Sequence, residues 1–122
     1  MKLNQLSLAV DDVPAAGDVL QRHFGLRPAG EGHKNFALLH DDDGMTLALM
    51  DAGAEPVSYP RTFHLGFVLA SDDEVDDLHR RLEADGFEVG EPKRRHGAWS
   101  FGLEAPGGFR IAVRSRAGDG HD

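Results

Sequence analysis

The sequence predicts an α+β fold made of two consecutive βαβββ modules, and three observations support this prediction. The chain has 122 residues, which is enough for one compact domain. Its apolar residues alternate with period two in several short runs and recur at helical spacing in two longer ones. The order of these runs in the first half is repeated in the second. Neither half is large enough to be stable alone, so we expect each half to be stabilised by the sheet of the other.

The first module is predicted over residues 1–54 and begins with a strand. Polar and apolar residues alternate over 2–10, as they do in a half-buried strand. The Asp11-Asp12 pair can cap a following helix, Pro14 is tolerated in its first turn, and Gly25 is a natural C-terminal stop. The apolar stripe of this helix consists of Ala16, Val19, Leu20 and Phe24.

Two more strands of the first module are predicted over 35–40 and 45–50. They are joined by residues 41–44, and the Asp-Gly pair at the end of this linker is a strong hairpin signal. Residues 51–60 carry Gly, Pro and Ser in place of periodicity and are expected to link the modules. The hairpin is expected to place five residues on one face, namely Ala37, Leu39, Thr46, Ala48 and Met50.

The second module is predicted over residues 61–116, so that one domain of two repeats covers 1–116. Ser71 and Glu74 form a capping box at the start of its helix, which ends near Gly86. The helix stripe consists of Val75, Leu78 and Leu82, and the strands are expected over 62–69, 87–89, 98–103 and 109–114. The tail, 117–122, is small and polar and is predicted to be flexible.

Composition and charge exclude several classes of function. The chain is 40% hydrophobic and 28% charged, as ordinary globular proteins are. Its net charge of −8 repels phosphate backbones, so we expect no nucleic-acid partner. There is no cysteine, which excludes disulfides and zinc–thiolate sites and fits a reducing cytoplasm. No signal peptide is recognised, and no apolar run approaches the roughly 20 residues that span a bilayer. We therefore expect a cytoplasmic protein without a membrane partner.

The repeat and two segments resemble the vicinal-oxygen-chelate superfamily, which includes glyoxalase I, extradiol dioxygenases, fosfomycin-resistance enzymes and bleomycin-resistance proteins. The segments that carry the resemblance most clearly are 3–12 and 101–113, and the resemblance covers roughly residues 1–115. It implies that the modules form a curved mixed sheet, or cup, with helices on the convex side. It also implies a homodimer, the commonest soluble assembly. The modules can pair within one chain or be exchanged between chains, and the sequence leaves both arrangements open.

In metal-dependent relatives, four side chains, usually His and Glu, point into the cup from the first and last strands of each module. The matching positions here are Gln5, Ala48, His64 and Ala112. Only His64 is a good ligand, and sites of this kind use three or four protein ligands. The resemblance therefore implies no metal, no cofactor and no catalytic set. It also implies the loss of the carboxylate that glyoxalase-type isomerases use as a base.

Strand parity and the resemblance together suggest which residues bind a ligand. Trp99 has the parity of a core residue, but its indole could instead stack on a ligand. His64 could be a ligand contact or a structural histidine. The histidines other than His64 and His96 are scattered and are expected to be solvated or structural, namely His23, His33, His40, His79 and His121. The candidate ligand-binding residues are Gln5, Ser7, Leu39, Ala48, Met50, Tyr59, His64, His96, Trp99, Ser100, Gly102, Arg110 and Ala112.

Two functions from different classes remain. The first is non-catalytic sequestration of a small organic molecule, such as an aromatic drug or natural product, of the bleomycin-resistance type. The second is a metal-dependent glyoxalase-type lyase or isomerase, or a dioxygenase, with a non-standard metal site that could join His64 to His96 or to carboxylates. A metal-free variant would use His64 as a general base. The retained cup and the missing ligands favour sequestration, and the sequence leaves catalysis open.

Overall fold

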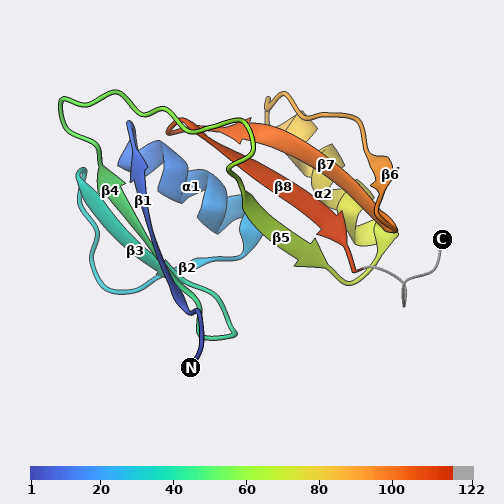
Figure 1. The fold of residues 1–122 in the computed structure, drawn as a ribbon, viewed down its shortest axis with the longest axis horizontal. Coiled ribbons are helices and arrows are strands. Elements are labelled where there is room, and N and C mark those ends of the chain that lie inside the picture. The colour runs from blue at the N-terminus through green and yellow to red at the C-terminus, as the bar shows by residue number, and fades with distance from the viewer. Residues whose placement is uncertain (117–122) are drawn as a thin grey trace. The chain divides into compact units, whose positions relative to one another are not determined.

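The computed structural model describes residues 1–116, and the tail predicted to be flexible, 117–122, lies outside the described residues (Figure 1). Contacts divide the chain into two compact units. The first consists of Met1–Tyr59 with Ala105–Phe109, and the second runs over Pro60–Glu104 and continues from Arg110. Each unit contains one helix and a four-stranded sheet, and the strand and helix order repeats once. The predicted α+β class and the two βαβββ modules are confirmed.

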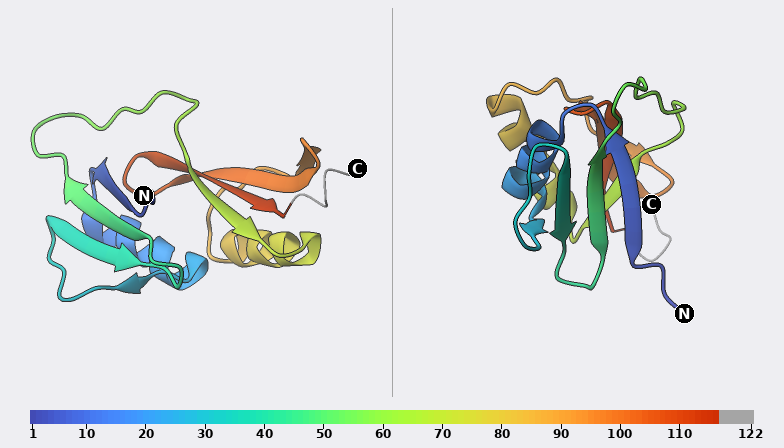
Figure 2. Two further views of the ribbon diagram at one scale, coloured as in Figure 1. Left: turned by 60° about the horizontal axis from the view of Figure 1, so that its bottom comes forward. Right: turned by 90° about the vertical axis from the view of Figure 1, so that its left-hand side faces the viewer.

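The first sheet has the order β1-β4-β3-β2, and α1 covers one of its faces (Figure 2). β1 runs parallel to β4, whereas β3 is antiparallel to both β4 and β2. The side chain of Asp12 accepts a hydrogen bond from the Ala15 amide, and Gly25 ends the helix with a φ of 72°. The elements are β1 Gln5–Val10, α1 Val13–Phe24, β2 Arg27–Pro28, β3 Phe36–His40 and β4 Thr46–Asp51.

The second sheet has the order β5-β8-β7-β6 and carries α2 on one face. Ser71 caps α2 by accepting a hydrogen bond from the Glu74 amide, as the capping box predicts. The elements are β5 Leu65–Leu69, α2 Asp72–Ala84, β6 Lys93–Arg95, β7 Ala98–Ala105 and β8 Phe109–Ser115. At 12 and 13 residues, neither described helix is long and apolar enough to cross a membrane.

The register between β3 and β4 differs from the prediction by one residue. Leu39 lies opposite Leu47, and Ala48 lies opposite Leu38. The carboxylate of Asp41 accepts hydrogen bonds from the amides of Asp43 and Met45, which lengthens the loop to residues 41–45. A slip of one residue moves every side chain of a strand to the other face. The predicted placement of Ala37 and Leu39 on the face of Ala48 is therefore wrong, and Leu39 is fully buried on the α1 side.

The strands before β7 also differ from the prediction. The expected strand over 87–89 is reduced to a single bridge between Val89 and Leu103. β6 is formed instead by three exposed charged residues and pairs with β7 through a two-residue turn, His96-Gly97. His96 adopts a φ of 49° in this turn and Gly97 a φ of 83°. β6 carries no apolar alternation, so the periodicity of the sequence could not reveal it.

Candidate ligand-binding site

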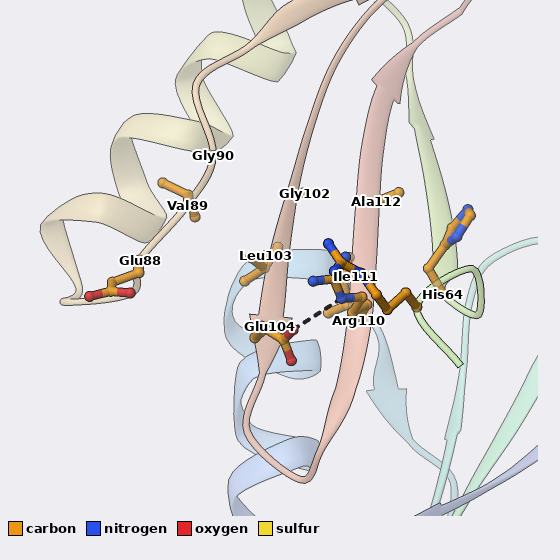
Figure 3. A pocket seen from close by; sticks show the side chains of 11 residues that line it. His64, Glu88, Val89, Gly90, Gly102, Leu103, Glu104, Arg110, Ile111 and Ala112 are labelled. Atoms are coloured by element: carbon orange, nitrogen blue, oxygen red, sulfur yellow. Dashed lines mark hydrogen bonds and ion pairs between the residues drawn. The ribbon is translucent and has the colours of Figure 1, made fainter. Parts of the chain in front are cut away.

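The second unit has a hollow of about 480 Å³ on the open face of its sheet (Figure 3). Its walls come from Arg61 and His64 in the segment before β5, from strands β7 and β8, and from the segment 88–90. This volume lies within the range of roughly 300–1,000 Å³ that small-molecule sites occupy. The residues that line it are Arg61, His64, Glu88, Val89, Gly90, Gly102, Leu103, Glu104, Arg110, Ile111 and Ala112.

The floor of the hollow is mostly bare backbone. Gly90 and Gly102 are joined by a hydrogen bond of 3.0 Å from the Gly90 amide to the Gly102 carbonyl, and Ala112 follows on β8. Gly66 lies opposite Ala112 in the β5–β8 ladder, and a Cβ built on Gly66 would meet no atom within 4 Å. At these four positions, of which Gly66 lies just outside the lining, the chain thus presents at most one methyl group to the solvent. A flat molecule could lie directly on this surface, since no long side chain rises from it.

Charged side chains border this floor. Arg110 donates from Nε to Oε1 of Glu104 at 3.0 Å, across β8 and β7 (Figure 3). The Nδ1 atom of His64 lies 3.1 Å from the Thr62 carbonyl, which can only accept, so this contact requires the proton on Nδ1. Nε2 then has a lone pair available. Arg61 and Glu88 complete a border of mixed sign, which suits a ligand with both donor and acceptor groups.

The structure brings four of the predicted site residues together in this hollow, namely His64, Gly102, Arg110 and Ala112. Sequence reasoning missed the charged members Arg61, Glu88 and Glu104. Glu104 could have been found, because it follows Gly102 by two residues on the same strand and therefore shares its face. Arg61 and Glu88 lie outside the strands, and no pattern in the sequence places them at the hollow.

Three predicted site residues of the second unit lie elsewhere. The indole Nε1 of Trp99 donates to Oδ1 of Asp76 at 2.7 Å, which holds this ring beside α2. Ser100 donates to the Lys93 carbonyl at 3.3 Å on the neighbouring strand. His96 is exposed at the turn between β6 and β7. None of these three lines the described hollow.

In the first unit, four of the predicted residues lie on the open face of the sheet. Ser7 lies opposite Ala48 in the β1–β4 ladder, and Gln5 and Met50 follow the same alternation on their strands. Tyr59 lies at the edge of the sheet. Its hydroxyl donates to the Ala9 carbonyl at 2.7 Å and accepts from the Ala9 amide at 3.0 Å. One phenol thus satisfies a backbone pair that an adjacent strand would otherwise satisfy.

The residues at the metal positions implied by the resemblance do not fit a divalent ion. In the second unit, His64 offers one imidazole, while Ala112 presents only a methyl group to the hollow. In the first unit, Gln5 offers an amide and Ala48 offers no ligand atom. Zinc sites use three or four protein ligands, commonly imidazole, thiolate or carboxylate. These residues therefore lack the ligands that a divalent ion needs.

A pair of opposite charges connects α2 to β6. Nη2 of Arg94 donates to Oδ2 of Asp72 at 2.7 Å, and the Arg94 guanidinium lies 5.3 Å from the centre of the Trp99 ring. The hydrogen bond from Arg94, followed by one from Ser115, lowers the pKa of Asp72 below its ordinary value. A lowered pKa in the folded state stabilises the protein above the unfolded pKa, and this contribution is lost as pH falls through the folded pKa.

We predict that Asp72→Asn destabilises the protein at neutral pH and that this difference disappears in acid. The variant lacks the carboxylate at every pH, whereas the native carboxylate is lost only on protonation. Urea unfolding of both proteins at neutral pH and at a series of acidic pH values measures the difference. Asp73→Asn, an exposed neighbour on the same helix, is the control. If the two free energies of unfolding differed by the same amount at neutral pH and in strong acid, the lowered pKa of Asp72 would be contradicted.

Comparison with known proteins identifies the family. The family model of the Glyoxalase/Bleomycin resistance protein/Dioxygenase superfamily matches residues 2–113. A structure described as a possible glyoxalase from Bacillus cereus is 45% identical, with a TM-score of 0.85 over 93% of this chain and 98% of that one. A lactoylglutathione lyase from Agrobacterium tumefaciens shares the fold at 22% identity, with a TM-score of 0.68 over 93% and 92% of the two chains. The comparison with curated proteins found no match. With this family model covering nearly all of its length, the chain belongs to the Glyoxalase/Bleomycin resistance protein/Dioxygenase superfamily.

Proposed function

We propose that the protein sequesters a small, flat organic molecule in the hollow of the second unit and releases it unchanged. The observation that carries this proposal is the backbone floor formed by Gly90, Gly102 and Ala112. It offers flat contact area, while the side chains around it offer hydrogen bonds and charge. The homodimer and the cytoplasmic location expected from the sequence belong to the same proposal.

Sequestration needs affinity alone, because no transition state has to be stabilised. Micromolar binding requires roughly 8 kcal/mol of binding free energy, and nanomolar binding about 12 kcal/mol. An aromatic ligand lying on the floor would bury apolar surface on one side. Its polar substituents could reach His64 and the Arg110–Glu104 pair at the border of the floor. These contacts would select ligands that carry both donors and acceptors.

An enzymatic function is the second candidate, and one observation favours it. The 45% identical structure is described as a possible glyoxalase. Here His64 would act without a metal as a general base, taking a proton from the bound compound. Its Nε2 lone pair at the edge of the hollow is the required group. Conversion of a bound compound would distinguish this function from sequestration.

The experiment is a calorimetric screen of flat aromatic antibiotics and their planar fragments against the full chain. Trp99 lies beside α2, so its fluorescence is a less direct readout than heat of binding. For any compound that binds, we expect Gly102→Leu to weaken binding by about 5- to 150-fold, since a steric clash of this kind costs roughly 1–3 kcal/mol. The site tolerates this change locally, because a Cβ on Gly102 would lie an ordinary 3.5 Å from the Ile111 carbonyl.

Ser100→Leu is the matched control, because residue 100 lies on the same strand and the same face but outside the lining. We expect this variant to bind as the native protein does. The bound compound is then recovered and compared with the starting material by mass spectrometry and NMR. Equal affinity of the Gly102→Leu variant would exclude the hollow as the site, and a chemically altered compound would exclude simple sequestration.

A further inference from the structure

We propose that the second unit carries a divalent-cation site on the α2 side of its sheet, made by His79, Glu83 and Glu91, with zinc as the fitting ion. One nitrogen and carboxylate oxygens from these three residues lie within 4.8 Å of one another. They are the one such group of histidine, aspartate and glutamate within residues 1–116. None of the three lines the ligand hollow, so this site is argued independently of the proposed function.

His79 is the buried anchor of the site. The residue is 7% exposed, and its ring meets the ring of Phe101 edge-on, with centroids 5.1 Å apart. Its Nε2 lies 3.1 Å from the carbonyl of Gly90. A carbonyl can only accept, so Nε2 holds a proton, and the neutral ring keeps its lone pair on Nδ1. This is the arrangement of metal-binding histidines, whose second nitrogen typically donates to a carbonyl or carboxylate.

The Nδ1 lone pair of His79 faces the Glu83 carboxylate in place of a hydrogen-bond donor. Oε1 of Glu83 lies 3.9 Å from Nδ1, too far for a hydrogen bond, and Glu91 completes the group. A lone pair and two carboxylates all repel one another unless a positive charge lies between them. The three groups are therefore complementary to a cation. A proton on Nδ1 is the competing occupant.

The backbone already holds the three residues in place. His79 and Glu83 are four residues apart on α2 and so occupy the same face of the helix. Glu91 follows Gly90, whose amide donates to the Gly102 carbonyl at 3.0 Å and whose own carbonyl accepts from His79. The Glu83 side chain is 57% exposed, which leaves a route from solvent. Ligand atoms around tetrahedral zinc are about 3.3 Å apart, so rotation of two glutamate side chains closes the site.

The donor set selects the ion. Calcium and magnesium take six or more oxygen ligands or water, and an imidazole nitrogen does not suit them. Zinc accepts imidazole and carboxylate together in a tetrahedral site, with water in the fourth position. An ion here would tie α2 to the segment ahead of β6. Because Gly90 in that segment also lines the hollow, the ion would brace one wall of it.

The test measures zinc binding to the full chain, prepared without an affinity tag and dialysed against a chelator. Competition with a chromogenic chelator gives the affinity, and the visible absorption of bound Co²⁺ reports tetrahedral geometry. We expect one equivalent to bind the native protein. Glu83→Gln/Glu91→Gln is expected to weaken zinc binding by at least about tenfold, and His79→Gln by about 100-fold, since even outer partners of a metal change affinity 10- to 100-fold.

The variants separate the loss of zinc ligands from a loss of folding. The double glutamine variant changes two exposed side chains, so it should fold even if the change at buried His79 disturbs α2. Asp73→Asn removes an exposed carboxylate from the same helix and should bind zinc as the native protein does. Zinc should also raise the melting temperature of the native protein and leave that of the double variant unchanged. The proposal is overturned if the double variant binds zinc with native affinity, or if the native protein binds no zinc.

Discussion

Replacing Phe109 with alanine is expected to lower the free energy of unfolding by about 3–5 kcal/mol, the usual loss when a buried phenylalanine is truncated. Phe109 begins β8, is 1% exposed, and is the largest of the fully buried side chains among the described residues. Its removal loses the free energy gained by moving the phenyl ring from water into the core. It also leaves a cavity that the close-packed neighbours cannot fill. Since small domains unfold with a free energy of about 5–15 kcal/mol, the variant should lose a large share of its stability.

Urea unfolding followed by circular dichroism measures this loss. Val68→Ala is the matched control, because Val68 lies on β5 and is 52% exposed. We expect it to change the free energy of unfolding by less than about 0.5 kcal/mol. If both variants unfolded at the same urea concentration, Phe109 would not contribute to the core as its burial indicates.

Local signals in the sequence predicted both helices well. Asp12 and Ser71 cap their helices through side-chain oxygens that accept from amides three residues ahead, at Ala15 and Glu74. A cap of this kind depends on neighbours in the chain, so its residue types are informative without tertiary context. The same holds for the left-handed Gly25 that ends α1.

Register could not be predicted in the same way. The repeat aligns Met45 with Phe109, yet Phe109 starts β8, whereas Met45 stays in the β3–β4 loop. The difference comes from one side chain, since the Asp41 carboxylate takes the Met45 amide that a strand would otherwise use. Counting loop residues by composition misses such a hydrogen bond. A single missed residue was enough to assign Leu39 to the wrong face.

The lining of the hollow overlaps the predicted residues only in part, for a related reason. His64 and Ala112 were found from the family positions, and Gly102 and Arg110 from strand parity. The charged residues between which a ligand would lie come together only through pairing of distant segments. The position of His79 indicates burial, because this residue falls beside Leu78 and four residues after Val75 on the buried stripe of α2. A histidine in that position is expected to be buried and to need partners.

Two glycines with positive φ allow backbone strain to be separated from steric clash. Gly107 has a φ of 106°, and Gly86 has a φ of 93°. A Cβ on Gly86 would meet no atom within 4 Å, whereas one on Gly107 would lie 3.1 Å from the Cβ atoms of both Val10 and Ala16. The Gly107 carbonyl also accepts from the Asp11 amide at 3.0 Å, so this loop cannot shift without losing a hydrogen bond.

We therefore expect Gly86→Ala to lower the free energy of unfolding by about 1–2 kcal/mol, the cost of a left-handed conformation for a residue with a Cβ. Gly107→Ala should lose that amount and a further 1–3 kcal/mol or so from overpacking against α1 and the end of β1. Urea unfolding of both variants measures the difference, and the excess for Gly107 is the steric part alone. Equal losses would mean that the loop between β7 and β8 moves away from Val10 and Ala16 at little cost in free energy.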